Sequence, residues 1–259
     1  MNADTLVVES SLYIPNAAVS IQDLPCGYLD DQGVLHREVQ VRAMTGFEEE
    51  LLGNDKIPGM KKFNQLLVNC LVRIGQIDEK AKIASIVPKL LVGDRVFLFL
   101  QIRRVTIGDT LPFRSTCPVK SCRKESRHLV NLGDLPVQVM QDARKRSFTA
   151  TLPVSKQAVQ YRCANGEDEE RAEKFEDRVE AASLILLQRI EQLDGKPPTL
   201  GDLQAMHWVD REFLREAFDK GEGGLDTSID LECSHCGHQY RKEVPVGQAG
   251  FFYPRTLSL

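Results

Sequence analysis

The sequence predicts an α+β protein with two internally duplicated halves, in which each half has a short strand pair, helices and a β-hairpin carrying two cysteines. Three observations predict this fold class. Segments of the first half recur in the second, strand and helix periodicities alternate along the chain, and each half ends its pattern with a cysteine pair. We place the halves at residues 1–146 and 147–259, and we expect one compact body with a shared core.

One fixed offset relates the two halves. Four landmarks recur 116 positions later (189 − 73 and 210 − 94): residues 73–80 as 189–196, residues 94–98 as 210–214, Gly108 as Gly224, and Cys117 as Cys233. Upstream, residues 24–27 are similar to residues 152–155 after small insertions. Chance matches of common residues do not explain one offset at four separated places, so an internal duplication is predicted.

Each half opens with two short strands. The alternation of apolar and polar residues, as around Val39 and Val41 or around Val159 and Tyr161, is the period-two signal of a strand. The expected strands are residues 18–23 and 35–42 in the first half, and residues 147–152 and 158–163 in the second.

Helices follow the strands. Thr45 and Glu48 form the pattern of a capping box, and an amphipathic helix is expected over residues 60–74. In the second half, the acidic residues 167–170 suit a helix N-terminus. Apolar residues at helical spacing then continue the expected helix through Leu193.

The internal repeat also assigns an ambiguous segment. Residues 96–100 form a short apolar run, which by itself fits a strand or a buried helix. Their counterpart, residues 210–221, has the amphipathic pattern of a helix that ends at a glycine. We therefore expect a helix from Asp94 to about Val105, capped by Asp94.

The cysteine pairs carry the clearest chemical signal. Cys117 and Cys122, and likewise Cys233 and Cys236, interrupt a strand pair, an arrangement that points two thiolates at one place as in a zinc knuckle. The flanking strands are expected at residues 111–116 with 127–132, and at residues 227–232 with 239–244. Four thiolates fill the tetrahedral shell of zinc, so we predict one structural Zn²⁺ per chain, at a site shared by both halves.

Alternatives remain for this site. The first pair has four intervening residues where two are usual, and His128, His235 or His238 could replace one cysteine as a ligand. A disulfide, or thiols that lie in unrelated loops, is the competing interpretation. A reducing cytoplasm favours the metal.

The remaining residues do not suggest catalysis. The sequence has no Gly-rich phosphate loop, no His-Glu-x-x-His and no Gly-x-Ser-x-Gly motif. Cys70 lies in the apolar run of a predicted helix and is expected to be a buried thiol, while Cys26 and Cys163 have no assigned role. We therefore expect a non-enzymatic protein without a small-molecule substrate.

Composition and charge narrow the class of protein. The 259 residues are 42% hydrophobic, enough for a sizeable core. The net charge of -4 gives no overall case for nucleic-acid binding, although basic residues surround the first cysteine pair: Arg114, Lys120, Arg123, Lys124, Arg127 and His128. No apolar run approaches the ~18 residues of a membrane span, and the first residues lack a secretory pattern. We expect synthesis in a cytoplasm and no membrane association.

Three consecutive aromatic residues, Phe251, Phe252 and Tyr253, lie near the end of the sequence. They either fold back onto the core of their own chain or dock into a neighbouring chain, where aromatic side chains dominate binding energy. We name them as candidate partner-binding residues.

The order of these motifs resembles that of a known family. Leu-Pro-x-Gly at residues 24–27, Val-x-Val-Arg at 39–42, Thr-Gly-x-Glu-Glu at 45–49, Gly-Asp-Arg before an apolar helix at 93–103, and Cys-Pro at 117–118 are similar to the small baseplate hub proteins of tailed bacteriophages. The resemblance covers about residues 24–254. The strand pair is shared with phage tail assembly chaperones, whereas the helix with a split knuckle is not. This chain departs from the pattern in its wide first knuckle and in Val154-Ser155, where a glycine is expected.

This resemblance implies a structural, non-enzymatic component of the phage tail baseplate, located in the virion at the hub and docked on other tail proteins. Two alternatives remain open. One is an assembly factor that binds tail proteins and is absent from the mature particle. The other is a zinc-ribbon module that binds nucleic acid, for which a salt-dependent affinity would be the sign.

Overall fold

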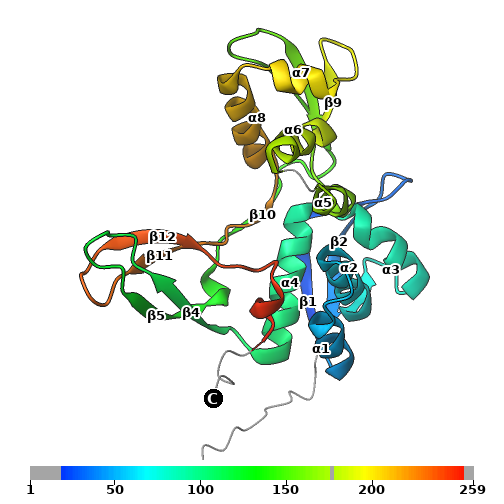
Figure 1. Ribbon diagram of the computed structural model, residues 1–259. Coiled ribbons are helices and arrows are strands. Elements are labelled where there is room, and N and C mark those ends of the chain that lie inside the picture. Colours follow the sequence, from blue (N-terminus) through cyan, green and yellow to red (C-terminus); the bar gives the residue numbers. More distant parts are fainter. Residues whose placement is uncertain (1–18, 176–177, 254–259) are drawn as a thin grey trace, which may run out of the picture.

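The structure is a computed structural model that describes residues 19–175 and 178–253. Ala18, the first residue of an expected strand, lies outside the described residues. So does Pro254, which follows the three aromatic residues. Figure 1 shows a main body, a second lobe that carries α6 to α8, and an arm made of two β-hairpins. Helices and antiparallel strands are both present throughout, so the predicted α+β class is confirmed.

The main body begins with an antiparallel sheet in the order β1-β2-β3. Its strands are Val19–Leu29, Leu35–Arg42 and Leu71–Ile74; α1 (Gly46–Gly53) and α2 (Gly59–Cys70) lie between β2 and β3. The predicted capping box of Thr45 and Glu48 is present. The helix expected to reach Ile74 ends at Cys70 instead, because the next four residues pair with β2. The sequence does not predict this boundary, because the helix passes directly into a strand without an intervening turn.

Three further helical elements complete the main body: α3 (Lys80–Ile86), a 3₁₀ turn η1 (Val87–Lys89) and α4 (Val92–Ile107). The helix predicted over residues 94–105 is thus confirmed and slightly longer. Its predicted cap is wrong, because Leu91 is the N-cap residue and Asp94 lies inside the first turn. The Asp94 carboxylate instead accepts a hydrogen bond from the Cys26 backbone N–H at 2.7 Å, across to β1.

The second lobe has its own antiparallel sheet, in the order β7-β8-β9. Its elements are β7 (Ser147–Thr151), β8 (Ala158–Arg162), α5 (Gly166–Glu173), α6 (Arg178–Arg189), β9 (Ile190–Leu193), α7 (Leu200–Ala205) and α8 (Trp208–Gly221). The helix expected to continue through Leu193 ends at Arg189, and the next four residues pair with β8. The same error therefore occurs in both halves for the same reason.

The two sheets share their strand order and place a register shift at the same point of the middle strand, between residues 40 and 41 and between residues 160 and 161. The third strands correspond at an offset of 119 (193 − 74), since Val39 pairs with Ile74 and Val159 with Leu193. The offset of 116 read at this landmark is therefore wrong by three residues. The likeness supports an internal duplication, which stays a prediction.

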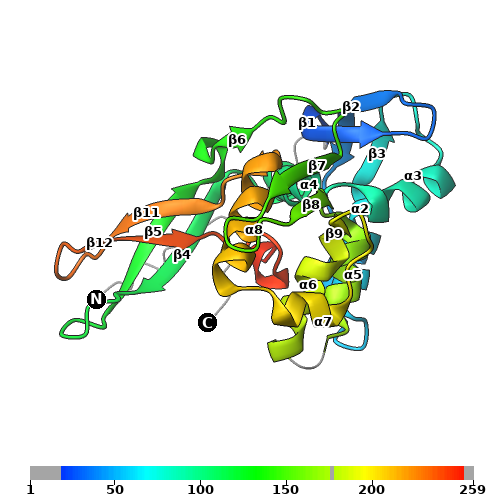
Figure 2. The same ribbon diagram turned by 90° about the horizontal axis from the view of Figure 1, so that it is seen from above.

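Two hairpins form the arm (Figure 2). The first is β4 (Thr110–Thr116) with β5 (Glu125–Asn131), and the second is β11 (Ser228–Glu232) with β12 (Gln239–Glu243). A short antiparallel strand pair, β6 (Val137–Gln138) with β10 (Gly224–Leu225), connects the two parts of the chain. Two 3₁₀ turns, η2 (Leu132–Asp134) and η3 (Ala249–Phe251), are also present. All four predicted knuckle strands are confirmed within about two residues.

The buried apolar side chains fall into two large clusters in the described residues, where one shared core was expected. The first combines residues 24–135 with Val244, Val246, Phe251 and Phe252. The second lies within residues 152–218. The domain boundary at residues 146 and 147 agrees with this separation only in part, because residues near the C-terminal end of the described chain return to the first core. The boundary and the single compact body stay predictions.

The two parts of the chain cross where only glycine fits. A Cβ atom on Gly93, in the first turn of α4, would lie 2.0 Å from the carbonyl oxygen of Gly223. A Cβ on Gly223 would lie 2.8 Å from the Met140 nitrogen. Real Cβ atoms do not approach this closely, so both glycines are required for the close approach of backbone to backbone.

Candidate metal centre

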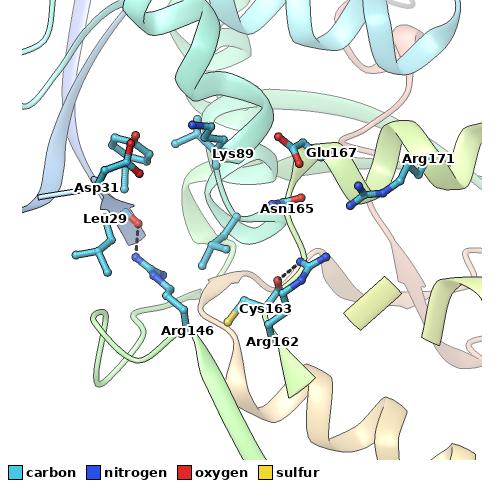
Figure 3. A pocket seen from close by; sticks show the side chains of 13 residues that line it. Leu29, Asp31, Lys89, Arg146, Arg162, Cys163, Asn165, Glu167 and Arg171 are labelled. Carbon is cyan, nitrogen blue, oxygen red and sulfur yellow. Dashed lines mark hydrogen bonds between the residues drawn. The ribbon is translucent and has the colours of Figure 1, made fainter. Parts of the chain in front are cut away.

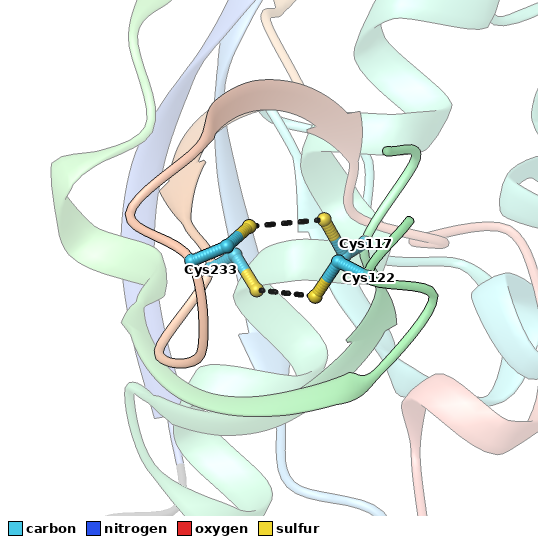
Figure 4. A group of neighbouring side chains, drawn as sticks. Cys117, Cys122 and Cys233 are labelled. Atoms are coloured by element: carbon cyan, nitrogen blue, oxygen red, sulfur yellow. Dashed lines mark hydrogen bonds between the residues drawn. The ribbon is translucent and has the colours of Figure 1, made fainter. Parts of the chain in front are cut away.

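The structure brings the four predicted cysteines together. Cys117 and Cys122 lie in the turn between β4 and β5, and Cys233 and Cys236 lie in the turn between β11 and β12. The four sulfur atoms all lie within 4.8 Å of one another. Figure 4 shows the sulfurs of one hairpin facing those of the other.

The sulfur spacing fits a tetrahedral metal shell. The Sγ atoms of Cys117 and Cys236 are 3.7 Å apart, and those of Cys122 and Cys233 are 3.8 Å apart. Disulfide sulfurs would lie about 2.05 Å apart. Zinc binds thiolate sulfur at about 2.3 Å, which places the sulfurs of a regular tetrahedron about 3.8 Å from one another. The cluster can therefore hold a metal ion between the two hairpins.

Both turns use a left-handed residue directly after the second cysteine. This residue is Gly237 with φ 70° in the second hairpin and Arg123 with φ 49° in the first. One backbone hydrogen bond closes each turn, from Cys233 N to His238 O and from Cys117 N to Lys124 O. The first, wider turn therefore ends with the same backbone geometry as the second. At its left-handed position it has Arg123, whose side chain carries a steric cost that a glycine would not.

Two serines join the hairpins to each other. The Ser126 hydroxyl donates to the Cys233 sulfur at 3.6 Å and accepts from the Ser234 backbone N–H at 3.2 Å. The Ser115 hydroxyl lies 2.6 Å from the Tyr240 hydroxyl. Sequence reasoning missed both serines. The available signal was the alternation in β5, which places a small polar residue on the buried face between Glu125 and Arg127.

Within the described residues, no histidine belongs to the cluster. His235 Nε2 lies 3.1 Å from the Glu125 carbonyl oxygen, and His128 Nε2 lies 3.2 Å from the Ser115 hydroxyl. His238 stacks on Tyr240. The donor set is therefore all cysteine, a combination typical of a closed structural zinc site.

Burial raises the pKa of the Cys117 thiol, whereas the surroundings of Cys233 favour its thiolate form. The backbone N–H of His235 has the largest effect on this thiol, and with the Ser126 hydroxyl it outweighs burial and lowers the pKa of Cys233 to about 6. The thiolate is the form of cysteine that binds metals.

The other three cysteines are buried elsewhere. Cys70 lies in the first core, as predicted, and burial raises the pKa of its thiol to about 12. Cys26 and Cys163 pack with Met140 in a small cluster of their own. Burial raises the pKa of both thiols, to about 11 for Cys163. Because these thiols stay protonated at neutral pH, they are poor nucleophiles.

A polar cavity of about 470 Å³ lies between the main body and the second lobe (Figure 3). Its three arginines bind groups of the fold. Arg162 and Arg171 both bind Asp168, and Arg146 donates to the Gly27 carbonyl oxygen at 2.7 Å. The lining of this cavity contains no serine or histidine, and its one cysteine is protonated. Its lining therefore holds no Ser–His or Cys–His pair.

The aromatic residues near the C-terminal end cover the first core. Phe251 and Phe252 are buried, and Phe252 packs edge-on against Phe99. The Arg103 guanidinium donates to the Phe251 carbonyl oxygen at 2.9 Å and lies over the Phe251 ring. Half-buried Tyr253 donates to the Glu49 carbonyl oxygen in α1. Both phenylalanine rings are thus covered by their own chain, the first of the two alternatives.

Comparison with protein families gives one match. Residues 29–253 match the family described as T4 bacteriophage base plate protein. The chain belongs to this family. The matched range of the base plate family contains both hairpins and all four clustered cysteines. Comparisons with curated proteins and with solved structures gave no match.

Membership in the base plate family confirms the resemblance at the level of the phage baseplate. It implies a structural protein of the virion tail that associates with other phage tail proteins. Among the described residues, no helix is both long enough and apolar enough to cross a membrane.

Proposed function

We propose that this protein is a non-enzymatic structural component of the hub region of a phage tail baseplate, where it docks on other tail proteins. The family match over residues 29–253 carries this proposal. Among the three C-terminal aromatics we retain Tyr253 as the partner-contact candidate, because Phe251 and Phe252 are buried in the first core.

Within this role, the cluster of Cys117, Cys122, Cys233 and Cys236 binds one structural zinc ion per chain. The donor set and the sulfur spacing support this assignment. One hairpin comes from each proposed half, so the ion joins the halves at the end of the arm and contributes directly to folding free energy. A closed shell of four thiolates leaves no position for a substrate.

The location is tested by quantitative mass spectrometry of purified tailed particles beside the lysate that produced them. A fixed copy number in the particle supports a baseplate component, and copurification with hub proteins in tail subassemblies supports the hub. Presence in the lysate but not in the particle identifies an assembly factor and rejects the proposal. Salt-dependent binding to DNA or RNA would instead support the nucleic-acid-binding alternative.

The metal is tested by elemental analysis of the purified chain. We expect one zinc per chain in the wild type and none in Cys233→Ser. The control is Cys163→Ala, which removes a buried thiol outside the cluster and leaves zinc content unchanged. Wild-type chain without metal, or equal metal content in the two variants, contradicts the assignment.

A further inference from the structure

The main body and the second lobe meet through a short backbone bridge. Leu91, directly before α4, forms an antiparallel bridge with Asn165, directly before α5. Three contacts make this junction: Val92 N donates to Ala164 O at 3.0 Å, Gly166 N donates to Leu90 O at 3.1 Å, and Arg95 Nε donates to Glu169 Oε2 at 2.6 Å. The start of one helix is therefore covered by the strand-to-helix junction of the other part of the chain.

The α4 side of this junction, residues 90–95, has a counterpart in the second lobe. Residues 206–208 lead into α8 as residues 90–92 lead into α4, and the last residue of each range is the first of its helix. The arginines that follow behave alike, because Arg95 Nη1 donates to the Val87 carbonyl oxygen and Arg211 Nη1 donates to that of Leu203. Both pairs are related by 116 positions (211 − 95 and 203 − 87).

The α5 side of the junction, residues 164–169, has a counterpart in the main body. Residues 44–46 lead into α1 as residues 164–166 lead into α5, and the glycine that ends each range is the first residue of its helix. Each junction begins a capping box, Thr45 with Glu48 and Asn165 with Asp168. Both pairs are related by 120 positions (165 − 45 and 168 − 48).

Both counterpart surfaces are open. Within the residues that the structure describes, the groups equivalent to those of the junction have no hydrogen-bond partner: Trp208 N, Met206 O, Met44 O, Gly46 N, Arg211 Nε and the Glu49 carboxylate. Each group on one surface has its complement on the other, donor for acceptor and cation for anion. An unpaired backbone edge of this kind is a template for pairing with another chain.

Each open surface also carries an exposed aromatic ring. Phe47, in the first turn of α1, is 80% exposed, and Trp208, at the start of α8, is 67% exposed. At the internal junction, their counterparts are Glu167 and Val92. Exposed aromatic side chains beside unpaired backbone groups are typical of a protein interface, where tryptophan and other large aromatics dominate binding.

The two surfaces lie at opposite ends of the molecule, α1 at one end and the start of α8 at the other (Figure 1). One chain therefore does not join its own two surfaces. We propose that copies of this protein associate head to tail, with residues 44–49 of one copy docking on residues 206–211 of the next. Trp208 N and Gly46 N donate to Met44 O and Met206 O across this interface, and Arg211 binds Glu49.

One difference limits the likeness to the internal junction. Val209 stands where Gly93 admits the Gly223 backbone, so the docked copy forms the bridge and the ion pair but not the glycine crossing. An interface between unlike surfaces is heterologous and produces a ring if the rotation closes, or a filament if it does not. The proposal is independent of whether the protein is built into the baseplate or assists its assembly.

The first test measures the mass of the full chain by sedimentation velocity over a range of concentrations. We expect concentration-dependent oligomers in the wild type. Phe47→Glu and Trp208→Glu each weaken association at least about tenfold, since a buried aromatic anchor is replaced by a charge. Leu129→Glu is the control, because Leu129 is 78% exposed on the arm and belongs to neither surface. Melting temperatures of all three variants stay near the wild-type value.

The second test mixes the two defective variants. Phe47→Glu keeps its Trp208 surface, and Trp208→Glu keeps its Phe47 surface. A 1:1 mixture therefore forms a dimer that cannot grow, although each variant alone is a monomer. A symmetric interface or non-specific apolar association does not give this result. A monomeric wild type, equal association of all variants, or a mixture that stays monomeric would falsify the proposal.

Discussion

Asp94 and Asp210 hold equivalent places in two helices, and each accepts hydrogen bonds from backbone N–H groups of the opening segment of its part of the chain. Asp94, in the first turn of α4, accepts a hydrogen bond from Cys26 N at 2.7 Å. Asp210, in the first turn of α8, accepts from Val154 N at 2.7 Å and from Ser155 N at 3.0 Å. Asp94 therefore joins the start of α4 to β1, and Asp210 joins the start of α8 to the turn after β7. They differ in that Asp94 Oδ2 has no hydrogen-bond partner among the described residues.

The balance between burial and hydrogen bonding gives the two carboxyl groups opposite pKa shifts. Burial raises the pKa of Asp94 to about 6, whereas at Asp210 the two backbone N–H groups outweigh burial and lower the pKa. A raised pKa stabilises the folded state at low pH, and this contribution is lost as pH rises through about 6. We expect the stability of Asp94→Asn relative to wild type to rise by about 2 kcal/mol between pH 4 and pH 7. Denaturant unfolding at several pH values measures this difference.

The matched control for this prediction is Asp210→Asn, whose effect has the opposite sign. A lowered pKa contributes stability above the ordinary range of an aspartate, and this contribution is lost on acidification. Asp210→Asn is therefore most destabilising at neutral pH. Parallel pH profiles for both variants would show that the two carboxyl groups do not differ as described.

Removal of the metal is expected to destabilise the wild type strongly. Excess chelator lowers its melting temperature by about 5 °C or more, because the four thiolates lose the ion that joins the hairpins. Cys233→Ser starts at the lower temperature and does not respond to chelator. Differential scanning fluorimetry with and without chelator measures both. An additive effect of variant and chelator would mean that the ion lies elsewhere.

Arg123→Gly is expected to stabilise the metal-loaded protein by roughly 0.5–1 kcal/mol, since glycine adopts a φ of 49° without the steric cost of a side chain. Urea unfolding of the zinc-loaded chain tests this. The control is Lys124→Gly, the neighbouring exposed position whose φ is not positive, which gains nothing.

Phe251→Ala is expected to cost about 3–5 kcal/mol, because the ring fills the first core under the Arg103 guanidinium. Phe47→Ala makes the same chemical change at an exposed position and costs less than about 0.5 kcal/mol in the isolated chain. Equal costs measured by urea unfolding would place Phe251 at the surface.

Local patterns predicted much of this fold. The cysteine spacing and strand alternation predicted both hairpins, and the internal repeat correctly made residues 96–100 part of a helix. Two helix ends were missed, after Cys70 and Arg189, because the apolar spacing runs on without a glycine or proline into a strand that only tertiary pairing defines. The role of Asp94 was missed because its partner, Cys26, is 68 positions away.

The meeting of the four cysteines could be predicted because both pairs occupy the same place in the repeat. The serines around them could not, since Ser126 acts on a sulfur 107 positions away and has no motif. The sequence did not predict the burial of Phe251 and Phe252, because a run of aromatic residues has the same pattern whether it packs on its own chain or on another.

The return of residues 244–252 to the first core has a consequence for the timing of folding. That core begins at Leu24. Arg103 in it donates a hydrogen bond to the Phe251 carbonyl oxygen, which lies 148 positions later in the sequence. The main body therefore cannot finish folding early in translation, although most of its residues are made first. Contacts this distant in sequence are slow to form, and until they do, the apolar surface that Phe251 and Phe252 later cover faces solvent. A ribosome that stops before residue 252 releases a chain whose first half is unfinished, not a shorter working protein.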